Sequence, residues 1–202
     1  LEDIEKDLDR IKKLRHSNLV TVYESELERC ESVWNLHILM EYSCGGTMVD
    51  LLKKCGVVRL PLAREYMKQL LDALDYIHAN SFAHKDIKAS NILFTEIPGK
   101  DEYIAKLADI SYHRKLLDMH KEFPFVKYSS KEPCKKWISP EHESRPNVYS
   151  RKSDIWYLGV IFVQMLFGLN AIQKYNSLDD LLSSSECDIP PAVQDVLRTM
   201  FE

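Results

Sequence analysis

The order of hydrophobic patterns along the chain predicts an α+β fold, in which one helix and two strands precede a mainly helical body. Over residues 2–14, apolar residues recur at helical spacing with charged residues between them. Runs rich in β-branched and aromatic residues follow at 19–23 and 34–40, and helical patterns dominate after residue 47. We therefore expect a small mixed part followed by a larger helical part.

Residues 2–14 are predicted to form one amphipathic helix. Its apolar stripe consists of Ile4, Leu8, Ile11 and Leu14. The runs Leu19–Tyr23 and Trp34–Met40 are predicted strands. The segment between them is rich in Glu and Ser, which fits a hairpin connection.

The helical body is predicted from its start signals and from the width of its apolar stripes. Thr47 can cap a short helix, and Pro61 opens a long helix with a broad apolar side. Ser153 and Asp154 start a helix that is apolar nearly all round, which places it at the centre of the body. A moderately amphipathic helix follows at 191–201.

Two short strand-like runs, at 91–94 and 103–107, lie between the long helices. The stretch from residue 111 to residue 137 is irregular and contains Pro124 and Pro133. A loop of that length in a compact domain is usually functional or disordered.

Composition excludes several classes of function. The 202 residues carry a net charge of -4 with a pI near 6.0, so we expect no direct nucleic-acid or membrane binding. Five cysteines without C-x-x-C spacing suggest neither a zinc site nor a disulfide framework, and they suit a reducing, cytoplasmic location. The longest apolar run, Ile155–Leu169, is too short to span a bilayer, and the acidic first residues do not resemble a secretory signal. Because the sequence begins and ends inside helical patterns, we expect it to be a piece of a longer protein.

The most informative motif is His84–Asn91, which follows a helical pattern and precedes an apolar run. It places Asp86, Lys88 and Asn91 at Asp-x-Lys-x-x-Asn spacing. Phosphoryl transfer needs such groups close together, because a carboxylate orients the hydroxyl, an ammonium balances phosphate charge and an amide oxygen holds magnesium.

This motif resembles the catalytic loop of protein kinases, His-Arg-Asp-x-x-x-x-Asn, with Lys85 in place of the usual Arg. Further segments resemble kinase motifs in the same order over nearly the whole chain. They are Leu14–Val20 after the regulatory helix, Met40–Tyr42 with Gly45 and Gly46 at the hinge, Asp109 of the Asp-Phe-Gly motif, Ser139–Glu141 of Ala-Pro-Glu, and Asp154–Gly159 at the start of the central helix.

The resemblance implies a protein-kinase-like fold with a truncated small lobe, formed by the regulatory helix and two or more antiparallel strands, on a mainly α-helical large lobe. Residues 1–41 would be the remnant of the small lobe and residues 42–202 the large lobe of one domain. The family positions are as follows: Asp86 and Lys88 are catalytic, Asn91 and Asp109 bind magnesium, and Met40, Glu41 and Tyr42 form the hinge that holds adenine.

Three segments resemble a narrower group, the pseudokinase domains of the general-control kinases that sense amino-acid starvation and phosphorylate translation initiation factor 2. They are His84–Asp86, Leu107–Tyr112 and Asp188–Asp195. In that group the pseudokinase directly precedes a true Ser/Thr kinase domain and helps to control it. The partners that this implies are the adjoining kinase domain, other regulatory modules of the same polypeptide and a second copy of the chain.

Each site residue has a functional and a structural interpretation. Asp86, Lys88 and Asn91 either act on phosphate and magnesium or only stabilise their own loop. His84 is predicted to be a core histidine. Lys85 cannot make the planar two-pronged contact of an arginine with a phosphorylated loop residue.

Departures from the kinase pattern favour an inactive protein. Ile110 and Ser111 replace Phe and Gly of Asp-Phe-Gly, and Asp7 stands where the regulatory helix usually carries Glu. No room remains before Leu14 for a glycine-rich loop and its lysine strand. We therefore expect no bound cofactor and no phosphate transfer.

Three functions follow from these observations. The preferred one is a pseudokinase that regulates a neighbouring kinase. The alternatives are a fragment of an active Ser/Thr protein kinase and a scaffold that binds ATP and Mg2+ without turnover.

Overall fold

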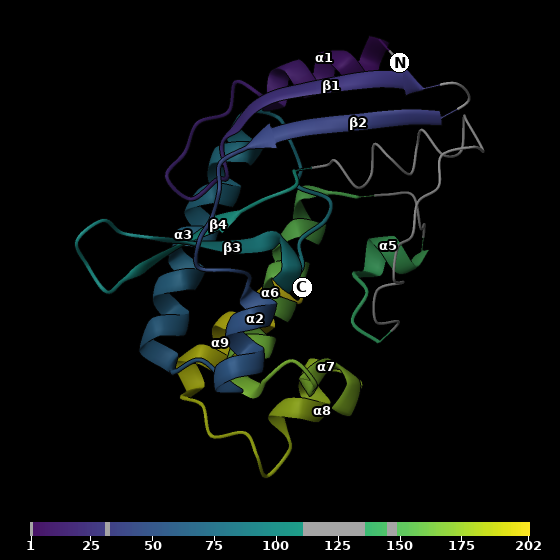
Figure 1. Cartoon of the computed structure of the whole chain (residues 1–202). Helices are drawn as coiled ribbons and strands as arrows, with labels where there is room; N and C mark the ends of the chain where they lie inside the picture. Colours follow the sequence, from purple (N-terminus) through teal and green to yellow (C-terminus); the bar gives the residue numbers. More distant parts are fainter. Residues whose placement is uncertain (1, 31–32, 111–135, 145–148) are drawn as a thin grey trace.

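The structure, a computed structural model, describes residues 2–30, 33–110, 136–144 and 149–202. One helix and a two-stranded hairpin lie at one end of the molecule, and the remaining helices form a body beside a second hairpin (Figure 1). The predicted α+β architecture is therefore confirmed.

The first helix, α1 (Glu2–Ile11), forms because its apolar stripe faces the core. Leu8, Ile11 and Leu14 are all buried. The helix ends three residues before the predicted position, since the N–H groups of Lys13 and Leu14 donate to carbonyls three residues back, at 3.1 and 3.0 Å. Such a tighter last turn is common at helix ends.

Strand β1 (Val22–Cys30) pairs in antiparallel fashion with β2 (Val33–Met40). The prediction that the Glu- and Ser-rich segment is a connection was wrong, because that segment is β1 itself. Its glutamates at positions 24, 26 and 28 are exposed, whereas Leu27 packs against the core. A strand with one solvated face can carry charged residues at alternate positions, so its composition alone does not predict a strand.

The second hairpin joins β3 (Ile92–Glu96) and β4 (Tyr103–Leu107). Part of the predicted first strand is used here, since Leu19 forms a parallel bridge with Leu107. The Leu107 N–H donates to Asn18 O at 2.9 Å, and the Val20 N–H donates to Leu107 O at 2.8 Å. These bonds attach the segment after α1 to the body.

The helices of the body follow the predicted order, with three short additions. They are α2 (Met48–Cys55), α3 (Leu60–Ala79), α5 (Pro140–Ser144), α6 (Arg151–Phe167), α7 (Ala171–Lys174), α8 (Leu178–Leu182) and α9 (Pro191–Met200), of which α5, α7 and α8 are the additions. A capping box at Thr47 starts α2, as predicted. Within the described residues, no helix is long and apolar enough to cross a membrane.

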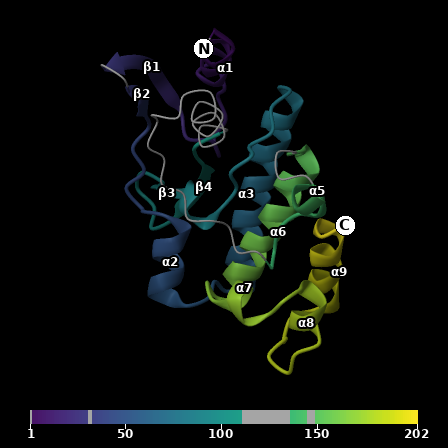
Figure 2. The ribbon, with the colours of Figure 1, turned by 90° about the vertical axis from the view of Figure 1, so that its right-hand side faces the viewer.

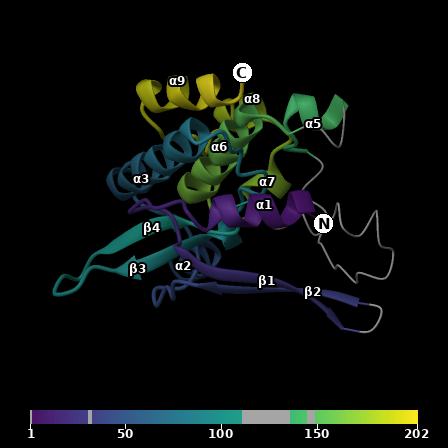
Figure 3. The same ribbon diagram turned by 90° about the horizontal axis from the view of Figure 1, so that it is seen from above.

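Helix α6 is the centre of the body and packs against α3 and α9 (Figure 2). It begins at Arg151, two residues before the predicted start, because Ser150 is its N-cap. At Gly159, a Cβ atom would lie 3.0 Å from the Phe201 ring and 3.2 Å from the Met200 side chain. The glycine therefore allows α9 to approach α6 closely. Seen from above, α1 runs beside the first hairpin, and it contacts β1 (Figure 3).

Candidate functional site

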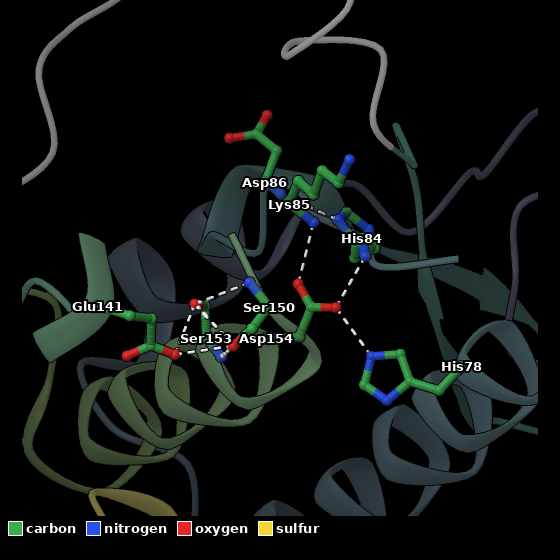
Figure 4. Close-up of polar contacts among 8 residues, drawn as sticks. All are labelled: His78, His84, Lys85, Asp86, Glu141, Ser150, Ser153 and Asp154. Carbon is green, nitrogen blue, oxygen red and sulfur yellow. Dashed lines mark hydrogen bonds and ion pairs between the residues drawn. The ribbon is translucent and has the colours of Figure 1, made fainter. Parts of the chain in front are cut away.

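The loop between α3 and β3 is anchored by Asp154, which is 1% exposed in the first turn of α6. The Asp154 carboxylate accepts the His84 N–H at 2.7 Å and the Lys85 N–H at 2.9 Å. A ring nitrogen of His78, on α3, lies 2.8 Å from the same carboxylate (Figure 4). One buried side chain thus joins α3, α6 and the loop that carries Asp86.

These bonds hold Lys85 in a strained conformation, with φ at 68°. A residue with a Cβ atom pays about 1 kcal/mol or more for this left-handed region. The two hydrogen bonds to Asp154 offset that cost and turn the chain so that Asp86 points away from α6 (Figure 4). The sequence analysis placed Asp154 at the start of the central helix, in a segment that resembles a kinase motif, but gave its carboxylate no role. The available signal was a carboxylate inside an otherwise apolar helix.

The structure brings together three predicted site residues. The Asp86 Oδ2 atom accepts from Lys88 Nζ at 2.8 Å and from Asn91 Nδ2 at 2.9 Å. Asn91 Nδ2 also donates to the Asp86 carbonyl at 2.9 Å, inside the 3-10 turn Ala89–Asn91. This arrangement stabilises the loop, and it leaves Asn91 Oδ1 as an acceptor.

His84 is a core histidine, as predicted, and its side chain is fully buried. Its Nδ1 atom accepts the Asp86 N–H at 3.3 Å. Burial lowers the pKa of His84, although nearby carboxylates oppose that change. The ring therefore supports the loop from below in its neutral form.

Asp109 follows β4 and also adopts a left-handed conformation, with φ at 62°. Burial raises the pKa of its carboxyl, and the charge of Asp86 adds to the rise, while His84 and Lys88 oppose it. Among the described residues, no side chain or backbone N–H donates a hydrogen bond to this carboxylate. Ile110 beside it is buried in the core, and Ser111 lies outside the described residues.

The oxygen atoms of Asp109 and Asn91 fit a magnesium ion in their chemistry, because Mg2+ prefers hard oxygen ligands. The raised pKa of Asp109 is consistent with this, since a cation would favour its charged form. A magnesium ion held there would neutralise phosphate charge. No group of three or more His, Cys, Asp or Glu side chains suited to a metal occurs in the described part of the chain. The protein's own ligands would therefore need others from a nucleotide or from water.

The predicted hinge residues are placed differently from one another. Met40 ends β2 and is partly buried, whereas Tyr42 is 84% exposed. The Glu41 N–H donates to Thr21 O at 2.8 Å, so this backbone donor already has a protein acceptor. The Glu41 side chain contacts Lys106.

Asp7 stands at the position that the kinase resemblance assigns to a glutamate of the regulatory helix. Its Oδ1 atom lies 3.5 Å from Arg10 Nη1 of the same helix. The Arg10 guanidinium in turn lies over the Phe82 ring, 4.5 Å from its centroid. The Asp7 carboxylate therefore contributes to a lateral contact of α1 with the segment before His84.

Glu141 has two polar partners at the amino end of α6. Its Oε1 atom accepts from Ser150 Oγ at 2.9 Å and from Ser153 Oγ at 2.8 Å. Burial raises the pKa of Glu141, but its own N–H, these hydroxyl groups and Lys152 outweigh burial and hold the pKa below its usual value. The charged carboxylate thus binds the amino end of α6, where the helix dipole also favours it.

A cleft of about 300 Å³ opens beside the loop. Lys85, Asp86 and Lys88 line one side, and Tyr157, Val160 and Gln164 of α6 line the other. The acid, the two lysines and a cleft large enough for a side chain lie together, as a phosphate-transfer site requires.

The fold and the loop together define a kinase-like protein. An α-helical body carries an Asp-x-Lys-x-x-Asn loop anchored to its central helix, below a helix and a hairpin. The pattern of the protein kinase domain matches residues 2–194 of this chain. The chain therefore belongs to the protein kinase family.

Individual relatives come from several groups of kinases. The chain is 30% identical to "eIF-2-alpha kinase GCN2" of Schizosaccharomyces pombe over 98% of its own length. It is 33% identical to "Mitogen-activated protein kinase kinase kinase 3" of Mus musculus over 81% of its length, and 31% identical to "Mitogen-activated protein kinase kinase kinase A" of Dictyostelium discoideum over 79%. The matched regions cover 13%, 24% and 15% of those proteins. The chain is similar to a kinase domain within larger proteins.

Proposed function

We propose that this chain is a pseudokinase, a kinase-shaped module that regulates an adjoining Ser/Thr kinase domain in the translational response to amino-acid starvation. Residues 1–41 would form its small lobe and residues 42–202 its large lobe. Its partners would be the adjoining kinase domain, other regulatory modules of the same polypeptide and a second copy of the chain. We place this activity in the cytoplasm.

The charge balance of the loop carries this proposal. Lys88 is already paired with Asp86 at 2.8 Å, and the pKa of Asp109 nearby is raised by burial and by the charge of Asp86, although His84 and Lys88 oppose the rise. Nucleotide phosphates would add further negative charge to this pair of carboxylates. Phosphoryl transfer depends mainly on positioning and charge stabilisation, so a site that repels phosphate transfers it poorly.

Two substitutions support the same conclusion. Asp7 interacts with Arg10 of its own helix, and its side chain is one methylene shorter than the glutamate usual at that position. Ile110 is buried in the core and lacks the aromatic ring that kinases repack between active and inactive states. The Asp7 and Ile110 substitutions both favour one fixed conformation over switching between an active and an inactive state.

The link to translation is supported by the similarity to a protein named as an eIF-2-alpha kinase, which extends over 98% of the chain. The three segments that resemble pseudokinases of the general-control kinases add to it.

An active kinase fragment is the second candidate. The contacts of Asn91 with the Asp86 carboxylate and carbonyl, both at 2.9 Å, support it because they leave an amide oxygen ready for a metal. Asp86 and Lys88 would then keep their family roles.

Phosphate transfer distinguishes the two candidates. The purified chain is incubated with Mg2+, labelled ATP and a generic protein substrate, beside an Asp86→Asn variant. We expect equal, background labelling from both proteins. Reproducible transfer that Asp86→Asn abolishes would overturn the proposal and support the active fragment.

Thermal unfolding tests the third function, a scaffold that binds nucleotide. A ligand that binds only the folded state raises its stability by mass action. The proposal predicts that millimolar MgATP leaves the melting temperature unchanged. A clear rise without phosphate transfer would instead support the nucleotide-binding scaffold.

A further inference from the structure

The ion pair between Glu41 and Lys106 differs from the other ion pairs in the described structure. Lys106 Nζ lies 2.5 Å from Glu41 Oε1, and the two side chains are only 11% and 19% exposed. This is the most buried lysine or arginine ion pair among the described residues. The Lys174–Glu186 pair has the same separation, but its side chains are 52% and 60% exposed.

Glu41 makes two further contacts, both with Thr21. Its Oε2 atom accepts the Thr21 N–H at 3.2 Å, and its own N–H donates to Thr21 O at 2.8 Å. Burial raises the pKa of Glu41, but the bonds from Lys106 and Thr21 outweigh burial and lower it overall. The side chain is therefore held in its charged form by two segments far apart in the sequence.

Lys106 projects from a strand that is itself fixed. Its neighbours Ala105 and Leu107 are buried, and Lys106 lies opposite Leu93 in the β3–β4 ladder. A shift of register by one residue would bury Lys106 and expose Ala105 and Leu107. The position of Lys106 is therefore strongly determined. Asp109 follows three residues later on the same segment.

We propose that Glu41 and Lys106 form an electrostatic latch, which holds the hinge against β4 and fixes how the α1–β2 part sits on the helical body. Opening the hinge would separate a largely buried ion pair, 11% and 19% exposed, and leave each charge without its partner in a site that water reaches only in part. The latch goes beyond the proposed function, because it describes how the two parts are held whether or not the chain transfers phosphate. A regulatory module held in this way presents a constant surface to a partner.

Backbone hydrogen exchange of the purified chain tests the latch without nucleotide or partner. The variants are Lys106→Met, which keeps the length of the side chain, and Glu41→Gln, which keeps its shape. Lys174→Met is the matched control, because it removes an equally short but exposed ion pair. We expect exchange of the Thr21 and Glu41 amides to rise about tenfold or more in both latch variants, while Lys174→Met leaves it unchanged.

The double variant and a conservative variant sharpen the result. If the two residues act as one unit, Lys106→Met with Glu41→Gln should open the hinge no more than the stronger single variant. Lys106→Arg keeps a cation and should retain protection, which remains informative if Lys106→Met does not fold. Unchanged exchange in Glu41→Gln, or effects that simply add in the double variant, would overturn the latch. Neither outcome depends on the phosphate-transfer assay.

Discussion

Asp154 and Asp109 both lie beside the catalytic-type loop and are both shielded from solvent, but they differ in the hydrogen bonds that their carboxylates receive. Asp154 receives two backbone N–H groups and lies 2.8 Å from a ring nitrogen of His78. Asp109 receives no hydrogen bond from any described residue, and burial raises the pKa of its carboxyl. Among the described residues, hydrogen-bond donors therefore satisfy the Asp154 carboxylate, whereas none donates to the Asp109 carboxylate.

The difference between these two carboxylates indicates which features of a kinase domain the described residues retain. Fully compensated carboxylates, Asp154 and Glu141, hold the loop and the start of α6 in place and are parts of the scaffold. Asp109 lies at the position that the kinase resemblance assigns to a magnesium ligand, and no described residue donates a hydrogen bond to it. Among the described residues, the carboxylates that hold the scaffold have donors, whereas Asp109 has none. Changing each carboxylate, or its donors, tests this contrast.

Replacing the anchor should have the largest effect. Asp154→Ala would leave two backbone N–H groups and His78 without an acceptor in a buried site, so we expect the free energy of unfolding to fall by about 3–5 kcal/mol. Urea unfolding measures the change. Asp195→Ala removes an aspartate that is 76% exposed and should change stability by less than about 0.5 kcal/mol. A small effect of Asp154→Ala would show that the loop does not depend on its anchor.

The contact of Glu141 with Ser150 should have an intermediate effect. Ser150→Ala removes an N-cap and one hydrogen bond to Glu141, and we expect a loss of about 1–2 kcal/mol in urea unfolding. Thr47→Ala removes the cap of α2, which has no carboxylate from another element, and should cost about 1 kcal/mol. Equal losses in the two variants would indicate that Glu141 adds nothing to the cap.

Replacing the carboxylate of Asp109 should raise the free energy of unfolding, in contrast to the two changes above. Asp109→Asn removes a poorly compensated charge, and asparagine tolerates the left-handed backbone at this position. We expect the free energy of unfolding to rise by about 1 kcal/mol at pH 7, measured by urea unfolding. A loss of stability would mean that the Asp109 carboxylate is compensated after all.

The pH dependence of stability gives the smallest but most diagnostic effect. Because folding raises the pKa of Asp109, its charge destabilises the folded chain above that pKa, and the penalty vanishes below the ordinary value of 3.8. The advantage of Asp109→Asn over the unaltered chain should therefore shrink as the pH falls from 7 toward 4.

The charge of Glu41 should have the opposite effect on the pH dependence of the free energy of unfolding. Its pKa is lowered on folding, so its charge stabilises the fold above the ordinary value of 4.5, and this stability is lost as the pH falls through the lower folded pKa. Glu41→Gln should be less stable than the unaltered chain at pH 7, and the deficit should shrink in acid. Urea unfolding at several pH values measures both variants, and differences that do not vary with pH would contradict both assignments.

Much of the fold could be predicted from local patterns. The stripe of α1, the cap at Thr47 and the apolar character of α6 are visible in the sequence because their determinants lie within a few residues of one another. Strand β1 could not be recognised, since its alternate glutamates face solvent and its partner strand supplies most of its stabilisation. Residues 111–135 of the predicted irregular stretch lie outside the described residues.

The sequence by itself determined the Asp86, Lys88 and Asn91 spacing, because a short loop keeps residues two and five positions apart within hydrogen-bonding reach. Only the tertiary structure decided which carboxylates are compensated. Asp154 and His84 are 70 residues apart, and Glu41 and Lys106 are 65 apart. Such partners meet through the packing of α6, α3 and the two hairpins, and this packing exists only once the chain has folded.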